Sequence, residues 1–406
     1  MNRGPLTGTH SRRSPSNRGL RTGFRQPYAP GDGGGPTNGF RSGLHRPFDP
    51  IANWRSSYRS AKAREQTLWV EFMGDSTTLG GGGHGAGADT WVNSVPALVR
   101  TAMVADGMPI DGPGFVQMIT SAADPTLTWG VPQHLTISGT WATVGGINGI
   151  GSSTANDQVT FTTSYARYVT AVHMRTFAGT YSFSYRIDGG SWVSSGTQTS
   201  GAALFRNFVV DCLTVGPHVV DFRVDTGLVV FEGFTSSIGA GGLQLHNAGI
   251  SGVGASGMVS GLVQSQGTIV VPALTVIRIG VNDWNNQTAL ATFRTNLQAK
   301  VDAAKAYGEV VMQTFFPATV EKTIPQWRYI DVTRSIARES GCLLIDTWAR
   351  WQTFDRPRFT GLMDDTVHPI PAGYMEDAYY LAKALTAPSP DEQIRFSGYE
   401  SSLGLG

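Results

Sequence analysis

The stretch TLWVEFMGDSTTLG, residues 67–80, passes from an apolar, β-prone run into Gly-Asp-Ser and then into a glycine-rich loop. A short apolar run bounded by turn residues predicts a buried strand. A helical pattern of apolar residues follows at 88–107, with a glycine at its end. The rigid strand would position the hydroxyl of Ser76, and the glycines would let a substrate approach the backbone closely. The stretch therefore predicts a strand that presents a serine at its carboxyl end.

Strands and helices alternate again beyond residue 239. The strand-like runs are 242–251, 274–283, 309–315 and 342–348, and the helical patterns are 286–308, 324–341 and 371–386. This alternation predicts a parallel sheet that helices cover on both faces. We therefore expect residues 67–120 and 239–386 to form one discontinuous α/β domain.

Residues 121–238 have a different texture, with short alternating segments between turn residues and a hairpin signal, Asp-Gly-Gly, at 188–190. No helical pattern appears there, which predicts an inserted all-β sandwich of jelly-roll type. Aromatic rings can stack on sugars or pack a core. A carbohydrate-binding module and a purely structural unit therefore both remain open. The aromatic candidates are Trp129, Trp141, Tyr181, Tyr185 and Trp192.

The ends of the chain and its composition limit the partners. The formal net charge of +1 argues against a protein that coats nucleic acid. No apolar run approaches the roughly 20 residues of a membrane helix. Residues 1–66 are rich in Gly, Pro, Ser and Arg and show no secretory signal, which predicts a flexible basic arm. This arm either docks on a virion or cell-surface partner or stays solvated. The polar tail, 387–406, is expected to be loose.

Active sites of open parallel sheets form beyond the carboxyl ends of the strands. Acyl transfer by a serine needs a base, a group that orients the base, and donors for the oxyanion. Ser76 is the candidate nucleophile. His368 is the candidate base, because an imidazole ordinarily titrates near neutrality, at about pH 6.5. Asp365, three residues earlier, can orient it. The Ser76 N–H, the Gly252 N–H and the Asn282 amide are the candidate oxyanion donors. This chemistry needs no metal or organic cofactor.

Four short blocks carry a family resemblance. GDS at 74–76, the glycine that ends NAGISG at 247–252, GVND at 280–283 and DTVH at 365–368 resemble the blocks of the SGNH (GDSL-type) hydrolases, in the family's order. The resemblance covers about residues 67–120 and 240–386. It implies a flavodoxin-like α/β/α sandwich, esterase or lipase chemistry and the five site residues already named. The first block departs from the family in lacking the commoner leucine after the serine. The inserted β unit is expected to alter substrate choice.

We expect a serine esterase that acts on carboxylic esters, in particular on O-acetyl groups of a polysaccharide or glycan. Two other interpretations stay open. One is a glycan-binding or virion attachment protein that keeps the hydrolase fold as a scaffold, because the basic arm weakly resembles phage tail proteins. The other is a lipid or aryl esterase, although no strongly apolar lid is visible. The sequence leaves the location open between a virion acting at a cell surface and the cytoplasm.

Several further residues have expected places. A lone buried charge costs several kcal/mol, so we predict that Glu71 and Arg278, each inside an apolar strand, pair beneath the site. Asp75 and Asp283 are expected to hold their loops, and Asp364 to be solvated. The remaining expectations are a mobile or substrate-contacting His84, a packed His246, Trp284 in the core or at the pocket, and Cys212 and Cys342 as buried thiols rather than a disulfide.

Overall fold

The structure is a computed structural model, and part of the chain is described in it. The expected N-terminal arm up to residue 48, His84, Trp129 and the tail from residue 388 lie outside the described residues. The described residues are 49–80, 94–110, 116–118, 134–143, 149–174, 179–199, 205–239, 241–258, 263–264, 267–268, 271–352 and 361–387.

Five parallel strands form one sheet in the order β12–β1–β15–β16–β17. Counted along the chain, this order is 2-1-3-4-5, the order of flavodoxin-like doubly wound sheets. The expected parallel sheet is confirmed. The order in which successive strands are added to the sheet reverses between β1 and β15. The strands are β1 (Thr67–Gly74), β12 (Gly242–Gly249), β15 (Leu274–Arg278), β16 (Glu309–Gln313) and β17 (Leu343–Ile345).

Helices cover both faces of this sheet, because its side chains alternate between two hydrophobic clusters. On β1, Val70 and Phe72 belong to the first cluster and Met73 to the second. On β16, Val311 belongs to the first cluster, and its two neighbours belong to the second. The first cluster includes α1 (Ala52–Lys62), α3 (Val95–Ala105), α7 (Thr347–Gln352) and α9 (Pro371–Thr386); the second includes α4 (Val281–Asn285), α5 (Leu290–Lys305) and α6 (Gln326–Glu339).

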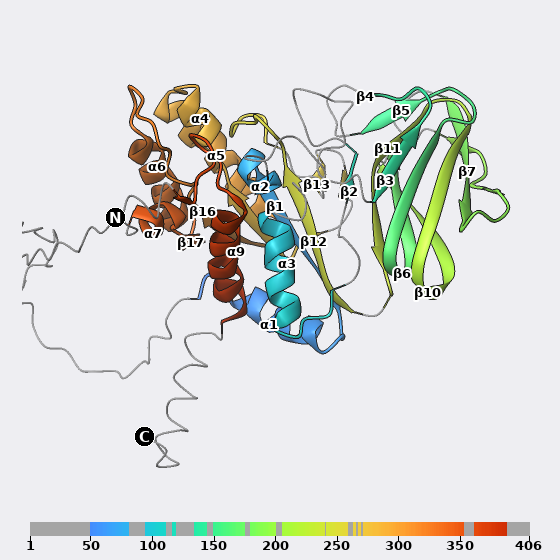
Figure 1. The fold of residues 1–406 in the computed structure, drawn as a ribbon, viewed down its shortest axis with the longest axis horizontal. Helices are drawn as coiled ribbons and strands as arrows, with labels where there is room; N and C mark the ends of the chain where they lie inside the picture. The colour runs from blue at the N-terminus through green and yellow to red at the C-terminus, as the bar shows by residue number, and fades with distance from the viewer. Residues whose placement is uncertain are drawn as a thin grey trace, which may run out of the picture. The chain divides into compact units, whose positions relative to one another are not determined.

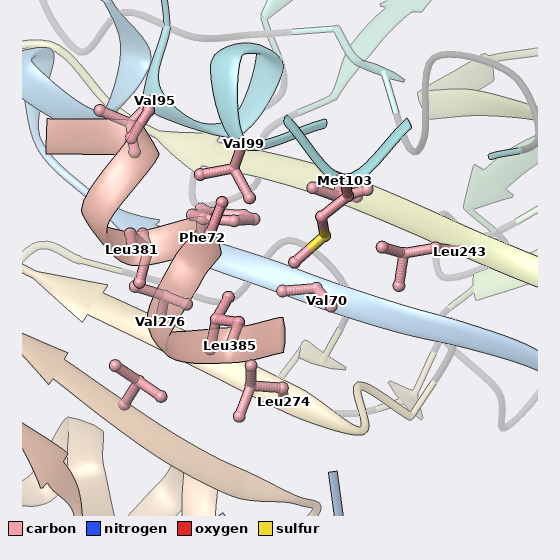
Figure 2. Packing of buried hydrophobic residues seen from close by; sticks show 14 of the residues in the cluster. Val70, Phe72, Val95, Val99, Met103, Leu243, Leu274, Val276, Leu381 and Leu385 are labelled. Atoms are coloured by element: carbon pink, nitrogen blue, oxygen red, sulfur yellow. The ribbon is translucent and has the colours of Figure 1, made fainter. Parts of the chain in front are cut away.

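Helices α3 and α9 lie side by side over the first face (Figure 1). Apolar side chains recur every four residues on α3, which makes one continuous stripe. Ser94 caps the helix by accepting a hydrogen bond from the Ala97 N–H (3.3 Å). Figure 2 shows the stripe together with Leu381 and Leu385 of α9 above the side chains of β1 and β15. The residues of the stripe are Val95, Val99 and Met103.

The expected boundary of the arm at residue 66 is wrong, because α1 belongs to the core. Trp54 and Tyr58 are buried, and the Trp54 indole N–H donates to the Leu385 carbonyl (3.0 Å). The two carboxylate oxygens of Glu309 accept hydrogen bonds from the N–H groups of Asn53 and Trp54 at the start of the helix. The many arginines and serines of the segment concealed an apolar stripe of Trp54, Tyr58 and an alanine at helical spacing.

Replacement of Trp54 by alanine is expected to lower the free energy of unfolding by about 3–5 kcal/mol, because the ring is 1% exposed and its removal leaves a large cavity. Urea denaturation would measure the change. Trp327→Ala on α6 is the matched control, since that ring is 44% exposed, and its effect should stay within about 0.5 kcal/mol. Equal losses in the two variants would contradict the placement of α1 in the core.

The expected ion pair between Glu71 and Arg278 is wrong. Glu71 lies opposite Thr275 in the register, three positions before Arg278. The two side chains also point to opposite faces, because Glu71 shares its face with Met73, whereas Arg278 lies over the Phe316 ring of the first cluster. Glu71 instead meets His246 on β12, with 3.4 Å between Oε1 and Nδ1. The expectation that His246 is packed at its strand is confirmed, since it is fully buried.

The inserted unit is antiparallel, and its ten strands form one hydrogen-bonded network. Strand β2 pairs with β11, so the unit begins before the expected residue 121. A further short hairpin, β13 (Val263–Gln264) with β14 (Gly267–Thr268), lies outside this sheet. The ten strands are β2 (Val116–Gln117), β3 (Leu135–Ser138), β4 (Ala142–Thr143), β5 (Ile150–Ser152), β6 (Gln158–Met174), β7 (Thr180–Ile187), β8 (Val193–Ser194), β9 (Gln198–Thr199), β10 (Phe205–Thr226) and β11 (Val229–Ser237).

Two long strands, β6 and β10, run along most of this sheet (Figure 1), which has one half around β3 and another around β11. The first half of β6 pairs with β3, and the second half pairs with β11. Register shifts around Gly216 interrupt the β6–β10 ladder, and irregularities of this kind let a strand bend. Rings of the two halves then meet: Phe161 stacks on Phe234 at 5.6 Å. The expected all-β insertion is confirmed. The stacked rings of its two parts support a sandwich in part, although the strand pairing is continuous.

Both cysteines are free thiols, as expected. Cys212 is buried in the β unit, and Cys342, before β17, is half-buried. Burial, together with the charges of Asp188 and Asp211, raises the pKa of the Cys212 thiol to about 11. Cys212 is therefore a packed thiol with little thiolate at neutral pH.

Candidate active site

Three strand ends that carry predicted site residues lie at the same level of the sheet. Gly74 of β1 is in register with Gly249 of β12 and with Arg278 of β15. The Ile250 N–H donates to the Gly74 carbonyl (3.0 Å), which ties the first two ends together. A side chain at position 74 would lie 2.4 Å from the Arg278 carbonyl oxygen, so only glycine fits. The loops that carry Ser76, Gly252 and Asn282 therefore start at the same edge of the sheet, from three adjacent strands.

Ser76 begins α2 (Ser76–Leu79), a single turn that follows β1 directly. Asp75 caps this turn: its Oδ1 accepts hydrogen bonds from the Thr77 N–H (2.9 Å) and the Thr77 hydroxyl (2.7 Å). Burial raises the pKa of Asp75, although the hydrogen bonds from Thr77 and the charge of Arg278 oppose the shift. The expectation that Asp75 holds its loop is confirmed. The cap and the strand end together fix the backbone that carries the nucleophile candidate.

Ser76, His368 and Asp365 form a continuous chain of hydrogen bonds. Ser76 Oγ lies 2.8 Å from His368 Nε2, and His368 Nδ1 lies 2.7 Å from Asp365 Oδ2. A proton on Nδ1, directed at the carboxylate, leaves Nε2 free to accept the serine proton. Asp364, next to this chain, is exposed as expected, and its N–H donates to the His368 carbonyl (2.9 Å).

The carboxylate of Asp365 is held by its own loop. Its Oδ1 accepts hydrogen bonds from the backbone N–H groups of Val367 and His368, both at 2.7 Å. Burial alone would raise the pKa of Asp365, but these bonds and the bond from the imidazole outweigh burial and lower the pKa. Its contribution to stability is therefore present above the ordinary carboxyl pKa of about 3.9 and is lost as the pH falls through the lowered folded value.

The lowered pKa of Asp365 simplifies the expected pH dependence of activity. Asp365 stays ionised from pH 5 to 8, so activity in that range should follow the imidazole, which must be neutral to accept a proton. We expect kcat/KM for a small ester to rise as the pH is raised from about 5 to 8, because only the neutral imidazole can accept the serine proton. Initial rates in buffers of constant ionic strength would show the rise. A flat profile from pH 5 to 8 would contradict the role of His368 as the base.

The predicted oxyanion donors lie in loops that hydrogen bonds hold in place. The structure gives the N–H groups of Ser76 and Gly252 no acceptor among the residues that it describes. The Asn282 Nδ2 group donates one hydrogen bond, to the Val253 carbonyl (2.9 Å), which leaves a second amide hydrogen available. Gly252 has a φ of +75°, in the left-handed region that favours glycine.

Asp283 connects the Gly252 loop to α4. Its Oδ2 accepts a hydrogen bond from the Ala255 N–H (2.8 Å), three residues after Gly252. Burial raises the pKa of Asp283, and the hydrogen bond from Ala255 opposes the shift. The expectation that Asp283 holds a loop is confirmed. Trp284, the next residue, is fully buried in the second cluster, so it belongs to the core.

The aromatic residues that were candidates for sugar binding are mostly packed where the structure describes them. Tyr181 is buried, and Tyr185 and Trp141 lie against the core of the β unit. The guanidinium groups of Arg186 and Arg223 lie 4.6 Å and 4.3 Å from the centre of the half-buried Trp192 ring. A carbohydrate-binding role of the unit stays a prediction.

In the described residues, no three or more His, Cys, Asp or Glu side chains gather as a metal site would require. No described helix is both long and apolar enough to span a membrane.

Sequence reasoning missed one group of residues near the site. Asp377 lies on α9 with no exposed surface, and it accepts hydrogen bonds from four side chains. The sequence did contain a signal for this residue. A carboxylate falls on the apolar face of the predicted helix at 371–386, between a buried tyrosine and a buried leucine. The four donors are Arg278, Gln313, Thr347 and Arg350.

A family model described as the GDSL-like lipase/acylhydrolase family matches residues 231–375. This range includes the predicted site residues from Gly252 to His368. It excludes Ser76, which precedes the β unit in the chain. No curated protein sequence matches the chain.

One solved structure, a peptidoglycan O-acetylesterase, aligns with a TM-score of 0.59 and 16% identity over 86% of this chain and 97% of its own. That share exceeds the α/β part alone, so the likeness of fold extends into the β unit. A carbohydrate esterase of family two from Clostridium thermocellum aligns with a TM-score of 0.29 and 13% identity over 62% of this chain and 98% of its own.

A mutant of an acetyl-xylooligosaccharide esterase from a Geobacillus species aligns with a TM-score of 0.30 and 24% identity over 36% of this chain and 74% of its own. TM-scores below 0.5 do not establish a shared fold with these last two proteins. Neither the family match nor these structures support a resemblance to phage tail proteins.

Proposed function

Because this chain is an SGNH-type carboxylic ester hydrolase with a domain of the GDSL-like lipase/acylhydrolase family, we propose a catalytic triad for it. The triad consists of Ser76, His368 and Asp365. The observation that carries the proposal is the hydrogen-bond chain from Ser76 Oγ to His368 Nε2 (2.8 Å) and from His368 Nδ1 to Asp365 Oδ2 (2.7 Å). A serine, a base and an orienting carboxylate in this order are the parts that acyl transfer by a serine requires.

In the first half of the reaction, Ser76 Oγ attacks the ester carbonyl carbon while His368 Nε2 takes the hydroxyl proton. The carbonyl oxygen becomes an oxyanion, and Asp365 stabilises the imidazolium. When the tetrahedral intermediate collapses, the bond to the alcohol oxygen breaks, and His368 gives its proton to that oxygen. The alcohol leaves, and the acyl group remains on Ser76.

In the second half, water attacks the acyl carbon and His368 takes one of its protons. Collapse of the second intermediate breaks the bond to Ser76 Oγ and returns the proton to it, so the carboxylic acid leaves and the enzyme is restored. The oxyanion of each intermediate is stabilised by the Ser76 N–H, the Gly252 N–H and the amide of Asn282. The loops that hold these donors start from adjacent strand ends, which supports this assignment.

We further propose that the natural substrates are O-acetyl groups on a glycan. Two findings support this proposal. The protein whose fold matches over 86% of this chain is described as a peptidoglycan O-acetylesterase. The β unit enters the chain between the first and second site blocks, where an insertion can contact a polymer beyond the acyl group. The scaffold alternative is disfavoured by an intact hydrogen-bond chain at the triad.

A panel of substrates tests this proposal. The purified protein would be assayed with p-nitrophenyl acetate, butyrate and octanoate, and with O-acetylated peptidoglycan and acetylated xylan, with released acetate as the second readout. We expect a preference for acetate over octanoate and release of acetate from at least one polymer. A preference for octanoate would favour the lipid esterase instead. Glycan binding without turnover of any ester would favour the scaffold.

A further inference from the structure

We infer that Arg278 and Asp377 are positioning residues that set the distance between the nucleophile and the base. This inference rests on the proposed function, because it concerns how the same site is assembled. Arg278 is 2% exposed, and Asp377 has no exposed surface. Arg278 Nη1 lies 2.8 Å from Asp377 Oδ2. Neither side chain touches the reacting atoms, so both act through the elements that they connect.

On the nucleophile side, the second guanidinium nitrogen of Arg278 donates to the Thr77 carbonyl oxygen. Thr77 follows Ser76 directly, and both lie in the four-residue helix α2. The helix is too short to be rigid by itself, and its last carbonyls have no partners within it. The guanidinium supplies one such partner from β15, the strand that neighbours β1. Arg278 therefore fixes the turn that carries the serine.

On the base side, Asp377 ties down the helix that follows His368. Helix α9 begins at Pro371, and Asp377 lies in its second turn. Besides Arg278, Asp377 accepts hydrogen bonds from Gln313 of β16 (2.7 Å) and Thr347 of α7 (2.7 Å). Hydrogen bonds from β15, β16 and α7 to its two oxygens hold this carboxylate in place. The position of α9, and with it the end of the loop that carries His368, is thereby fixed to the sheet.

The pair thus joins the two sides through one buried path: Ser76, Thr77 carbonyl, Arg278, Asp377, α9, His368. A buried ion pair contributes little net stability, because the loss of hydration offsets the attraction. The advantage of the pair lies in its geometry. The planar, forked guanidinium of Arg278 holds two acceptors in a fixed plane, which an apolar side chain of the same size could not do. The planar group also stacks 4.7 Å from the centre of the Phe316 ring, which limits its rotation.

Misplacement of a reacting group by about 1 Å can cost about 100-fold in rate. We therefore expect Arg278→Lys, which keeps the charge but not the fork, to lower kcat about 10- to 100-fold with KM changed less than about threefold. A second variant, Arg278→Met with Asp377→Asn, leaves no uncompensated charge and should lower kcat at least as much. Thermal unfolding and near-UV circular dichroism would confirm that each variant is folded.

Arg350→Met is the matched control. Arg350 also binds Asp377, with 3.0 Å between Nη2 and Oδ1, but it extends from α7 and also pairs with Glu376 of α9. Loss of this guanidinium should lower stability and leave kcat within about threefold of wild type. A merely structural role of Arg278 predicts instead that kcat falls in both variants or in neither.

Covalent labelling of Ser76 by a fluorophosphonate separates this inference from the proposed function. The labelling rate should fall in the Arg278 variants and stay near the wild-type rate in Arg350→Met. If the wild type is labelled and hydrolyses esters while folded Arg278 variants match it in labelling rate and kcat, the positioning role is overturned and the function stands. If the wild type is neither labelled nor active on any ester, both proposals fall.

Discussion

Replacement of Ser76 by alanine is expected to lower kcat/KM for a small acetyl ester by roughly 10⁴- to 10⁶-fold, because the members of a triad act as a unit. The change removes one hydroxyl, whose recorded partner is the imidazole at 2.8 Å. The cap of α2 depends on Asp75 and Thr77, so the fold should be unaffected. Rates of p-nitrophenyl acetate hydrolysis and the near-UV circular dichroism spectrum would measure the two effects.

Ser335→Ala is the control for loss of a serine hydroxyl. Ser335 lies on α6 and donates to Glu339 one turn later, away from the strand ends. This variant should keep wild-type turnover. If Ser76→Ala retained more than about a tenth of the wild-type activity, a margin far above the loss expected for a nucleophile, Ser76 would not be the nucleophile.

Replacement of Asp365 by asparagine is expected to lower kcat by about 10³- to 10⁴-fold. The amide oxygen can still accept the hydrogen bonds from Val367 and His368, so the loop should keep its shape. An amide NH₂ group facing Nδ1 would favour the tautomer that carries its proton on Nε2, and that tautomer cannot accept the proton of Ser76. The imidazolium would also lose its negative partner. Steady-state kinetics at pH 8 would test the expectation.

Asp364→Asn removes the same charge one residue earlier in the same loop. Asp364 is exposed, and within the described part of the chain only its backbone N–H makes a hydrogen bond, to the His368 carbonyl. We expect this variant to stay within about twofold of wild type, since surface charges are weakly coupled through water. Similar losses in the two variants would mean that the loop needs negative charge in general rather than the contact of Asp365 with Nδ1.

Much of the fold and of the site was predictable because the signals are local. Alternating apolar runs and helical stripes identified the parallel strands and most of the helices, and the strand-end rule selected Ser76, Gly252, Asn282 and His368. Asp365 was predictable because three residues of chain suffice to bring its carboxylate to the ring, 2.7 Å away. Segment α1 was missed, since arginines and serines outnumber the buried residues that make its stripe.

The order of the elements and the identity of the triad residues followed from the sequence, because the signals that mark them, strand ends and short motifs, are local. The pairing of buried charges, by contrast, depends on the tertiary structure. Arg278 meets Asp377, 99 residues away, and not Glu71, because register and side-chain alternation place Glu71 on the opposite face of the sheet. A buried charge pairs with the opposite charge that helix packing places on the same face of the sheet. The residue spacing within either segment does not reveal this packing.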